Sequence, residues 1–355
     1  MKKIAFITHS FHKITKSADV YVDELFGDKN KFEVDIFYNY EWGPKDQYKI
    51  FDKRIEGYDA VVILQLISFN LLRNINCKNI IFIPMYDYSR NFRIQRWLPS
   101  AGLKILTPVM AMSDKLRSIG LSSYNYKYYP EVEEYCIPKF DNVYFWNRVE
   151  KIDYKTVLKL LGDYKYSKIN IHKVPDPGNN PPLPGKNEIK NYNFTFTDWF
   201  ETKTDYLSNL SNFGIYIAPR PFEGGASAFI DALKSGSIVI APDIPPFNEY
   251  IDNTKNGFLY DLNNPKPLNL EDFNLEIISK TAFESVKKGR EDFEASLPAI
   301  HKYIFNDENY TYPTNYFENL EKVFEDSWYR FGILTNKDKI KIFFQFIFSK
   351  VKKRF

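Results

Sequence analysis

"APRPFEGGASAFIDALKSGSIVIAPDIPPFNEYI", from Ala218 to Ile251, is the stretch of this chain with the clearest pattern. It places a glutamate before two glycines and an aspartate eight positions after that glutamate. Apolar, β-branched runs flank it on both sides, which is typical of strands buried on both faces of a parallel sheet. The stretch therefore predicts a strand, a glycine-rich turn, a helix and a second buried strand.

The turn "PFEGGAS" has the composition of a backbone that approaches a ligand. Gly224 and Gly225 carry no Cβ that would keep a ligand away. Ser227 or a neighbour can cap the following helix, whose free N–H groups favour an anion such as phosphate. Glu223 precedes this helix and Asp231 lies inside it, so an elongated diphosphate ligand fits between two acids. The alternative is a tight turn without a ligand.

Two series of β-rich runs predict the fold class. The first series is "KIAFITH", "FEVDIFYNY", "DAVVILQL", "NIIFIPM" and "KILTPVMAMS", and the second is "NVYFWNR", "KINIHKV", "NFTFTDW", "GIYIAPR", "SIVIAPD" and "GFLYDL". Helical or polar segments separate the runs, which predicts an α/β protein with two Rossmann-like domains facing each other across a cleft. We expect these domains at 1–128 and 129–310, a helix that packs back on the first domain at 311–335, and a basic amphipathic tail at 336–355.

The motif E-x7-D, with G-S-I-V-I-A-P-D, N-E-Y-I and N-G-F-L after it, resembles the retaining GT-B-fold glycosyltransferases of the family 4 type. Their signature is E-x7-E followed by a small-residue helix. The match is close over residues 205–262, moderate over 143–172 and only architectural over the first third. The second acid here is Asp231, which is one methylene shorter than the family's glutamate. The resemblance implies a nucleoside-diphosphate sugar as donor and retention of configuration.

The resemblance also implies roles for the residues of this stretch. Glu223 would contact the hydroxyl groups of the donor sugar, and Asp231 would hold the ribose hydroxyls. Glu249 matches a downstream acid of the family, with a supporting role in the donor pocket or a role at a helix start. The remaining donor-binding residues, whose backbone would cradle sugar and diphosphate, are Gly224, Gly225, Ala226 and Ser227.

The piece "FWNRVEKIDYKTVLKLL" corresponds to a cationic element of that family. Arg148 and Lys151 would neutralise the diphosphate, although Asn147 replaces the family's glycine and the spacing is contracted. Fixed cations stabilise the charge that grows on a diphosphate leaving group as the glycosidic bond breaks. The alternative is two solvated surface cations before a helix.

Four further polar residues follow strands of the first series, on the side where the acceptor would bind. His9 and His12 lie in "THSFHKITKS" and could contact the acceptor, or they could be solvated loop residues. Asp87, in "MYDYSRNFRIQRW", could act as an acceptor-side base or cap a turn. Arg90 begins a run of arginines at every third position, which could grip an anionic acceptor or form a solvated helix face.

Several classes of protein are excluded by what the sequence lacks. The first strand is not followed by G-x-G-x-x-G, which argues against a nicotinamide or flavin dehydrogenase. Cys77 and Cys136 form no CxxC pair and no metal-ligand spacing is present, so no metal and no disulfide is expected. We find no signal peptide and no apolar run of about 18 residues. These patterns predict a cytoplasmic protein.

The formal net charge is +3, but the charge is unevenly distributed. Residues 336–355 hold seven Lys or Arg and one Asp, so the rest of the chain is mildly acidic and no nucleic-acid partner is expected. As a helix from Ile340, the tail has one Phe- and Ile-rich face and a basic end. This pattern predicts contact with an anionic membrane surface, at the inner face of the cell membrane, or packing on the body of the protein.

The sequence as a whole predicts a glycosyltransferase of the hexosyltransferase type that needs neither cofactor nor metal. It would move a sugar from a nucleotide sugar to a lipid-linked glycan acceptor, during the synthesis of surface polysaccharide or glycoconjugate. One alternative is a catalytically inactive glycosyltransferase-like scaffold. Others are a sugar-nucleotide epimerase or a phosphorylase on the same fold, although no pyridoxal lysine is identified.

Overall fold

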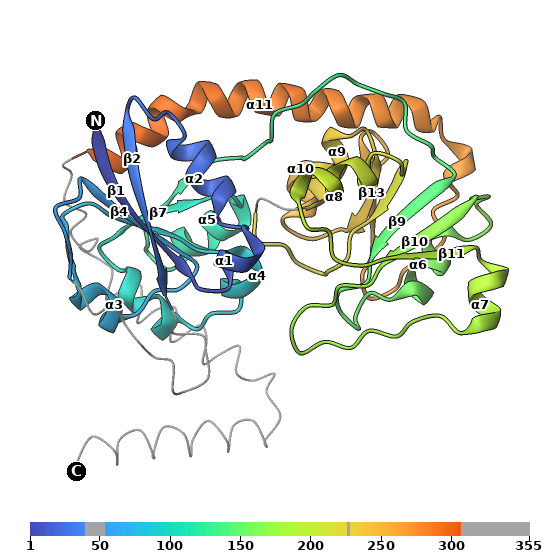
Figure 1. The fold of residues 1–355 in the computed structure, drawn as a ribbon, viewed down its shortest axis with the longest axis horizontal. Coiled ribbons are helices and arrows are strands. Elements are labelled where there is room, and N and C mark those ends of the chain that lie inside the picture. The colour runs from blue at the N-terminus through green and yellow to red at the C-terminus, as the bar shows by residue number, and fades with distance from the viewer. Residues whose placement is uncertain (40–53, 226–227, 307–355) are drawn as a thin grey trace, which may run out of the picture.

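The computed structural model describes residues 1–39, 54–225 and 228–306. Figure 1 shows two α/β units side by side, with the long helix α11 (Leu275–Phe305) running along both of them. Each unit is built around one parallel sheet. This arrangement of two Rossmann-like units confirms the predicted GT-B class of fold.

In its described residues, 1–39 and 54–125, the first unit has a six-stranded sheet and five α-helices. The strands are β1 Lys2–His9, β2 Phe32–Asn39, β4 Ala60–Leu64, β6 Ile80–Ile83, β7 Lys104–Thr107 and β8 Tyr124–Asn125. The helices are α1 His12–Thr15, α2 Asp19–Phe26, α3 Phe69–Arg73, α4 Tyr86–Ser89 and α5 Met110–Ser118, with a 3-10 helix at Ile94–Ser100. All strands are parallel, in the order β2-β1-β4-β6-β7-β8. A small separate sheet pairs β3 (Ile55–Glu56) with β5 (Ile75–Asn76).

The second unit repeats this plan. The strands are β9 Asn142–Trp146, β10 Lys168–His172, β11 Phe194–Thr197, β12 Ile215–Ile217, β13 Ile238–Pro242 and β14 Gly257–Tyr260. The helices are α6 Tyr154–Leu161, α7 Lys186–Asn191, α8 Lys203–Leu210, α9 Ala228–Lys234 and α10 Phe247–Tyr250, with a 3-10 helix at Leu270–Asp272. The strands are again parallel, in the order β11-β10-β9-β12-β13-β14.

Each of the eleven β-rich runs singled out in the sequence contains a strand of one of the two sheets. Their apolar character reflects burial on both faces, as in β4, where all five residues are buried. The pattern did not indicate the short strands β3, β5 and β8. These have two residues each, which is too short for a periodicity to be read.

A continuous apolar cluster connects the two units. It contains one face of the first sheet, with Ile4, Phe6 and Val62, and one face of the second, with Tyr144 and Tyr216. The opposite faces of the two sheets pack into separate clusters, one in each unit. The two units therefore share part of their hydrophobic core.

The linker between the sheets lies against α11 through a row of tyrosines. Tyr126 and Tyr128 pack on Phe293, and the Tyr135 hydroxyl lies 2.9 Å from Ser279 Oγ. The linker runs from the end of β8 to the start of β9, and the predicted boundary between 128 and 129 lies within it.

Helix α11 itself returns to the first unit. The segment predicted to pack back on that unit, 311–335, begins only after α11 has ended. In the structure the Tyr303 hydroxyl is hydrogen-bonded to the backbone of Ile105, and Lys104 Nζ donates to the carbonyl of Ile304 at 2.9 Å. The predicted segments 311–335 and 336–355 lie outside the described residues.

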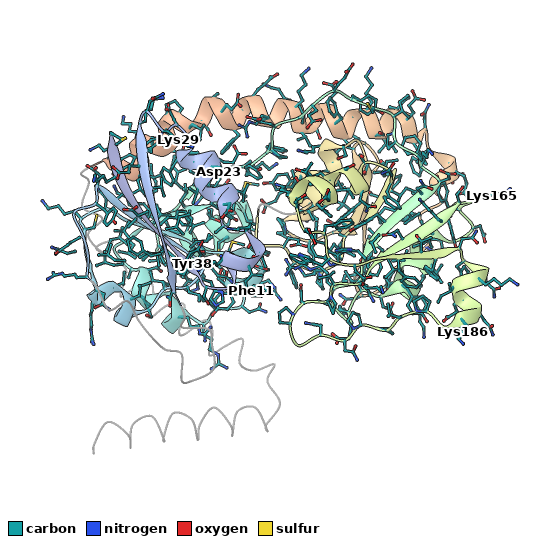
Figure 2. All side chains as sticks on the ribbon, in the orientation of Figure 1. Phe11, Asp23, Lys29, Tyr38, Lys165 and Lys186 are labelled. Atoms are coloured by element: carbon teal, nitrogen blue, oxygen red, sulfur yellow. The ribbon has the colours of Figure 1, made fainter. Side chains whose placement is uncertain are left out.

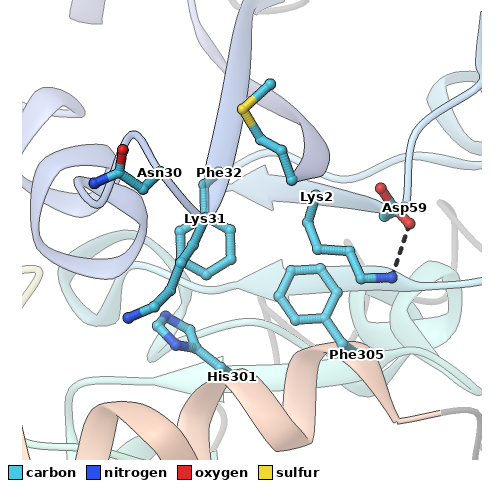
Figure 3. Close-up of a pocket in the computed structure, with 8 residues that line it drawn as sticks. Lys2, Asn30, Lys31, Phe32, Asp59, His301 and Phe305 are labelled. Carbon is cyan, nitrogen blue, oxygen red and sulfur yellow. Dashed lines mark hydrogen bonds and ion pairs between the residues drawn. The ribbon is translucent and has the colours of Figure 1, made fainter.

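The C-terminal end of α11 borders an open hollow at the amino ends of β1 and β2 (Figure 3). Phe305 stacks on Phe32 with ring centroids 5.9 Å apart, and Lys2 forms an ion pair with Asp59. This hollow lies at the opposite edge of the first sheet from the polar residues predicted to have a function, which follow the carboxyl ends of strands. The stacking of Phe305 on Phe32 holds the end of α11 against the first sheet.

Candidate functional site

The glycine-rich turn of the second unit contacts the first unit directly. Tyr86 N, at the start of α4, donates a hydrogen bond of 3.3 Å to the Gly224 carbonyl. A Cβ on Gly224 would collide with Met85. Gly225 has φ +147°, and a Cβ there would lie 2.5 Å from Pro108 Cγ. The two glycines therefore allow a close approach of the two units at the carboxyl ends of their strands.

An arginine that the sequence pattern did not single out is the centre of this site. The Arg220 side chain is 19 % exposed and follows β12 by three residues. Its guanidinium forms an ion pair with Glu223 and lies 3.4 Å from Asp87 Oδ2 and 3.3 Å from Asp176 Oδ2. Because Asp87 belongs to α4, this cluster joins the two units.

The predicted cation Arg148 belongs to the same cluster. Its Nε donates to Asp176 Oδ1 at 2.7 Å, and its guanidinium stacks over the Trp146 ring, 4.4 Å from the centroid. Lys151 does not join it. It is exposed, between the bridged residues Val149 and Ile152, and forms no ion pair with another described residue.

The electrostatics of the cluster are set by burial. Burial raises the pKa of Asp87, while the Arg220 guanidinium lowers it and Glu223 raises it further. The three carboxylates hold the pKa of Arg220 above its usual range, in spite of burial, which acts to lower it. The site therefore contains two permanent cations, Arg148 and Arg220, among three acids.

Asp231 lies in α9, with its side chain 16 % exposed and 4.0 Å from Lys203 Nζ. Burial raises the pKa of its carboxyl group, and Lys203 acts in the opposite direction. One face of the second sheet carries Tyr144 and Tyr216, and Tyr206 of α8 packs against Tyr144. The buried hydroxyl groups of these three tyrosines have no hydrogen-bond partner among the described residues. The Tyr144 and Tyr216 rings are stacked, with centroids 5.8 Å apart.

Sequence reasoning missed these three tyrosines. Their rings count as apolar residues in the patterns of β9, β12 and α8, so nothing in the sequence indicated that their hydroxyl groups are buried without a partner. A buried hydroxyl without a partner is costly, which makes such groups candidates for contact with a polar ligand.

The Glu249 carboxylate caps the N-terminus of α5, a helix of the first unit. Its two carboxylate oxygens accept hydrogen bonds from Met110 N at 2.8 Å and Ala111 N at 2.9 Å, in the first turn of α5. Lys127 donates to the Glu249 carbonyl. Both carboxylate oxygens are thus engaged at an N-terminus, where a negative charge is favourable. A donor contact for Glu249 remains a prediction, and this geometry does not support it.

His9 and His12 are buried rather than solvated, with 5 % and 8 % of their surface exposed. His12 Nδ1 is 2.6 Å from Thr8 Oγ1, and His9 Nδ1 accepts from Phe11 N at 3.1 Å. Burial lowers both pKa values, that of His12 to about 4 with a further effect of His9, so both rings are neutral at pH 7. Phe11 lies on the side of the first unit that faces the second (Figure 2).

Arg90 also joins the units, because its guanidinium stacks over the ring of Phe222, 3.6 Å from the centroid. The expectation of arginines on one helix face is wrong. Helix α4 ends at Ser89 and the next helical turn begins only at Ile94, so Arg90 and Arg96 do not share a helix.

Some of the predictions about the site cannot be followed in the structure. Ala226 and Ser227 lie outside the described residues. In the described ranges, no three His, Cys, Asp or Glu side chains are grouped as metal ligands require. Likewise, none of the helices that the structure describes has the length and apolar character needed to cross a membrane. The absence of a metal requirement stays a prediction.

The sequence matches no protein-family model and has no significant match among curated proteins. Similar solved structures include a sucrose-phosphate synthase from Thermosynechococcus elongatus, with a TM-score of 0.61, 11 % identity and coverage of 86 % of this chain and 99 % of that one. HepE from Anabaena in complex with UDP has a TM-score of 0.54 and 11 % identity, over 84 % of this chain and 100 % of that one.

A third structure, the G117R mutant of TarM from S. aureus with UDP and glycan ligands, has a TM-score of 0.47 and 17 % identity. It is matched over 70 % of this chain, which spans only 56 % of the length of TarM. At these identities the likeness to the first two structures establishes the GT-B architecture alone, and the activity has to be argued from the site.

Proposed function

We propose that this chain is a glycosyltransferase that moves a sugar from a nucleoside-diphosphate sugar to a glycan acceptor. The observation that carries the proposal is the convergence of Glu223, Arg148 and Asp87. Glu223 and Arg148 come from the loops after β12 and β9, and Asp87 comes from the first turn of α4, so all three lie at the facing carboxyl ends of the two sheets. This edge is where open α/β sheets bind ligands. The HepE structure, which contains UDP, shares the architecture.

The chemistry assigns a role to each group. Glu223 accepts hydrogen bonds from the donor sugar, and Asp231 accepts them from the ribose. Arg148 stabilises the charge that builds up on the leaving diphosphate, which requires no metal. A contact of Lys151 with the diphosphate stays a prediction, because its side chain lies outside the cluster. Asp87 faces Glu223 from the first unit and receives the proton of the acceptor hydroxyl. Retention of configuration follows if the acceptor attacks from the face that the diphosphate leaves, since no carboxylate is assigned as a nucleophile.

The acceptor is proposed to be a lipid-linked glycan at the cytoplasmic face of the membrane. His9, His12 and Arg90 lie in the first unit, on the acceptor side. The basic residues of 336–355 would bring the protein to an anionic surface. Sedimentation with vesicles of anionic lipid tests this part, with deletion of 336–355 as the comparison. Equal sedimentation of the two proteins would contradict it.

Isothermal titration of the purified protein with UDP, GDP, ADP and their sugars tests the donor site. We expect selective binding of one nucleotide, weakened at least tenfold by Arg148→Ala, because a fixed cation next to the diphosphate is lost. Lys159→Ala, in α6 of the same unit, removes a positive charge away from the site and should leave the affinity unchanged.

The other outcomes separate the alternatives. If a folded protein binds none of the nucleotides, the chain is an inactive scaffold and the proposal is wrong. If it converts its nucleotide sugar without an acceptor, it is an epimerase. A need for inorganic phosphate would indicate a phosphorylase.

A further inference from the structure

Arg220 lies among the proposed catalytic residues without a role in the mechanism given above. Its guanidinium contacts Glu223 and Asp176 of the second unit and Asp87 of the first. A guanidinium presents a planar fork of donors that suits phosphate as well as carboxylate. We propose that Arg220 is an additional anion-binding residue of the donor site, and that the donor's diphosphate replaces Asp87 on it. This inference rests on the proposed function.

The charge of the cluster explains why a replacement is needed. Arg148 and Arg220 face the carboxylates of Asp87, Asp176 and Glu223. A diphosphate placed next to all three acids would meet an excess of negative charge in a poorly solvated site, where repulsion is strong. When Asp87 leaves, two cations face two acids, and Arg220 has donor capacity for a phosphate oxygen.

Asp87 is the acid that can leave. Glu223 is three residues from Arg220 in the same loop, and its side chain is only 4 % exposed. Asp176 is bonded to Arg148 as well, and its backbone N–H donates to the Arg148 carbonyl at 3.0 Å. Asp87 reaches Arg220 from α4 of the other unit, at 3.4 Å. A small separation of the two units would break this contact alone among the three.

The surroundings of Asp87 favour its release. Its carboxylate is partly desolvated in the cluster, and the nearby Glu223 repels it, so both effects raise its pKa. Its contact with Arg220 offsets that cost only in part. Once it is released, the Asp87 carboxylate is hydrated by water, and the diphosphate binds the Arg220 guanidinium in its place.

Titration with inorganic pyrophosphate, in the absence of divalent metal, tests the inference because it isolates the diphosphate from base and sugar. If Asp87 competes for Arg220, the apparent affinity is reduced by the fraction of protein in which that contact is closed. Asp87→Asn should therefore bind pyrophosphate about tenfold more tightly than the wild-type protein, and Arg220→Gln at least tenfold more weakly. Both titrations should be repeated with the nucleotide that the wild type prefers.

Asp114→Asn is the matched control, because it removes one negative charge from an exposed position of α5 in the same unit. It should leave the affinity unchanged. If Asp87→Asn does not fold, Asp87→Ala replaces it, and thermal unfolding verifies each variant.

The outcomes distinguish this inference from the proposed function. Unchanged or weaker pyrophosphate binding by Asp87→Asn, with normal nucleotide binding by the wild type, overturns the competition and leaves the function intact. Unchanged affinity of Arg220→Gln overturns its role in anion binding. If neither the wild type nor Asp87→Asn binds pyrophosphate or any nucleotide, the proposed function itself is overturned.

Discussion

Glu249 illustrates, at the scale of the residue, that a side chain's partner need not be near it in sequence. Its carboxylate accepts two backbone hydrogen bonds in the first turn of α5, more than a hundred residues earlier in the chain. The residue before α5, Val109, has no side chain that can cap a helix. Glu249 therefore supplies from the second unit the cap that the local sequence lacks.

Glu249→Gln should lower the free energy of unfolding by about 1 kcal/mol, since the variant loses the charge at the helix N-terminus and one of the two accepting oxygens. Urea unfolding measures this change. Glu284→Gln changes an exposed acid in the middle of α11 and serves as the control, with little expected effect. Equal stability of the two variants would show that the contact with α5 contributes nothing.

Helix α11 illustrates, at the scale of the element, how one helix can join two units. It begins on the second unit, where Asn274 caps its first turn, and it ends on the first unit. Arg290, near its middle, forms an ion pair with Glu24 of α2. The helix and the tyrosine-rich linker lie so close together that Gly289 leaves no room for a side chain against the Tyr129 ring.

Gly289→Ala should destabilise the protein by about 1–3 kcal/mol, because the added methyl group would overlap the Tyr129 ring. On an exposed helix the same change would stabilise by about 1 kcal/mol. The sign of the change in the free energy of unfolding therefore shows whether the linker packs tightly against α11. Urea unfolding of Gly289→Ala in a Tyr129→Ala background is the matched comparison, and a penalty that persists there would contradict this explanation.

At the scale of the whole molecule, the buried histidines contribute to the dependence of stability on pH. His12 belongs to the first unit and His172 to the second, and burial lowers the pKa of each to about 4. Unfolded, each would have a pKa of about 6.5. Between these values the unfolded chain binds more protons than the native protein, so the free energy of unfolding falls as the pH falls.

We therefore expect urea unfolding to show decreasing stability from pH 6.5 towards pH 4, by up to about 1.4 kcal/mol per pH unit for each histidine. His172→Gln should make the slope shallower, because its contribution disappears. Asp87 and Asp231 have raised pKa values and act in the opposite direction, so the difference in slope between the two proteins is the informative quantity. An identical slope in His172→Gln would contradict the assignment.

The sequence by itself determined the class of fold. Buried parallel strands need apolar side chains on both faces, and this requirement is local enough to be visible as runs such as residues 60–64. It also indicated the glycine-rich turn after β12. The two glycines were predicted to admit a ligand, whereas in the structure they admit Met85 and Pro108 of the first unit. The sequence also indicated Glu223, Arg148 and Asp87, which the structure brings together around Arg220 and Asp176.

Only the tertiary structure decided which partners these residues have. Arg220 meets Asp87 because the loop after β12 of one unit lies against α4 of the other, and the distance between the two residues along the chain says nothing about that contact. The same holds for the cap that Glu249 supplies to α5 and for the return of α11 to the first unit. Periodicity reports whether a residue is buried, whereas ion pairs and caps depend on the packing of whole units, which no local pattern encodes.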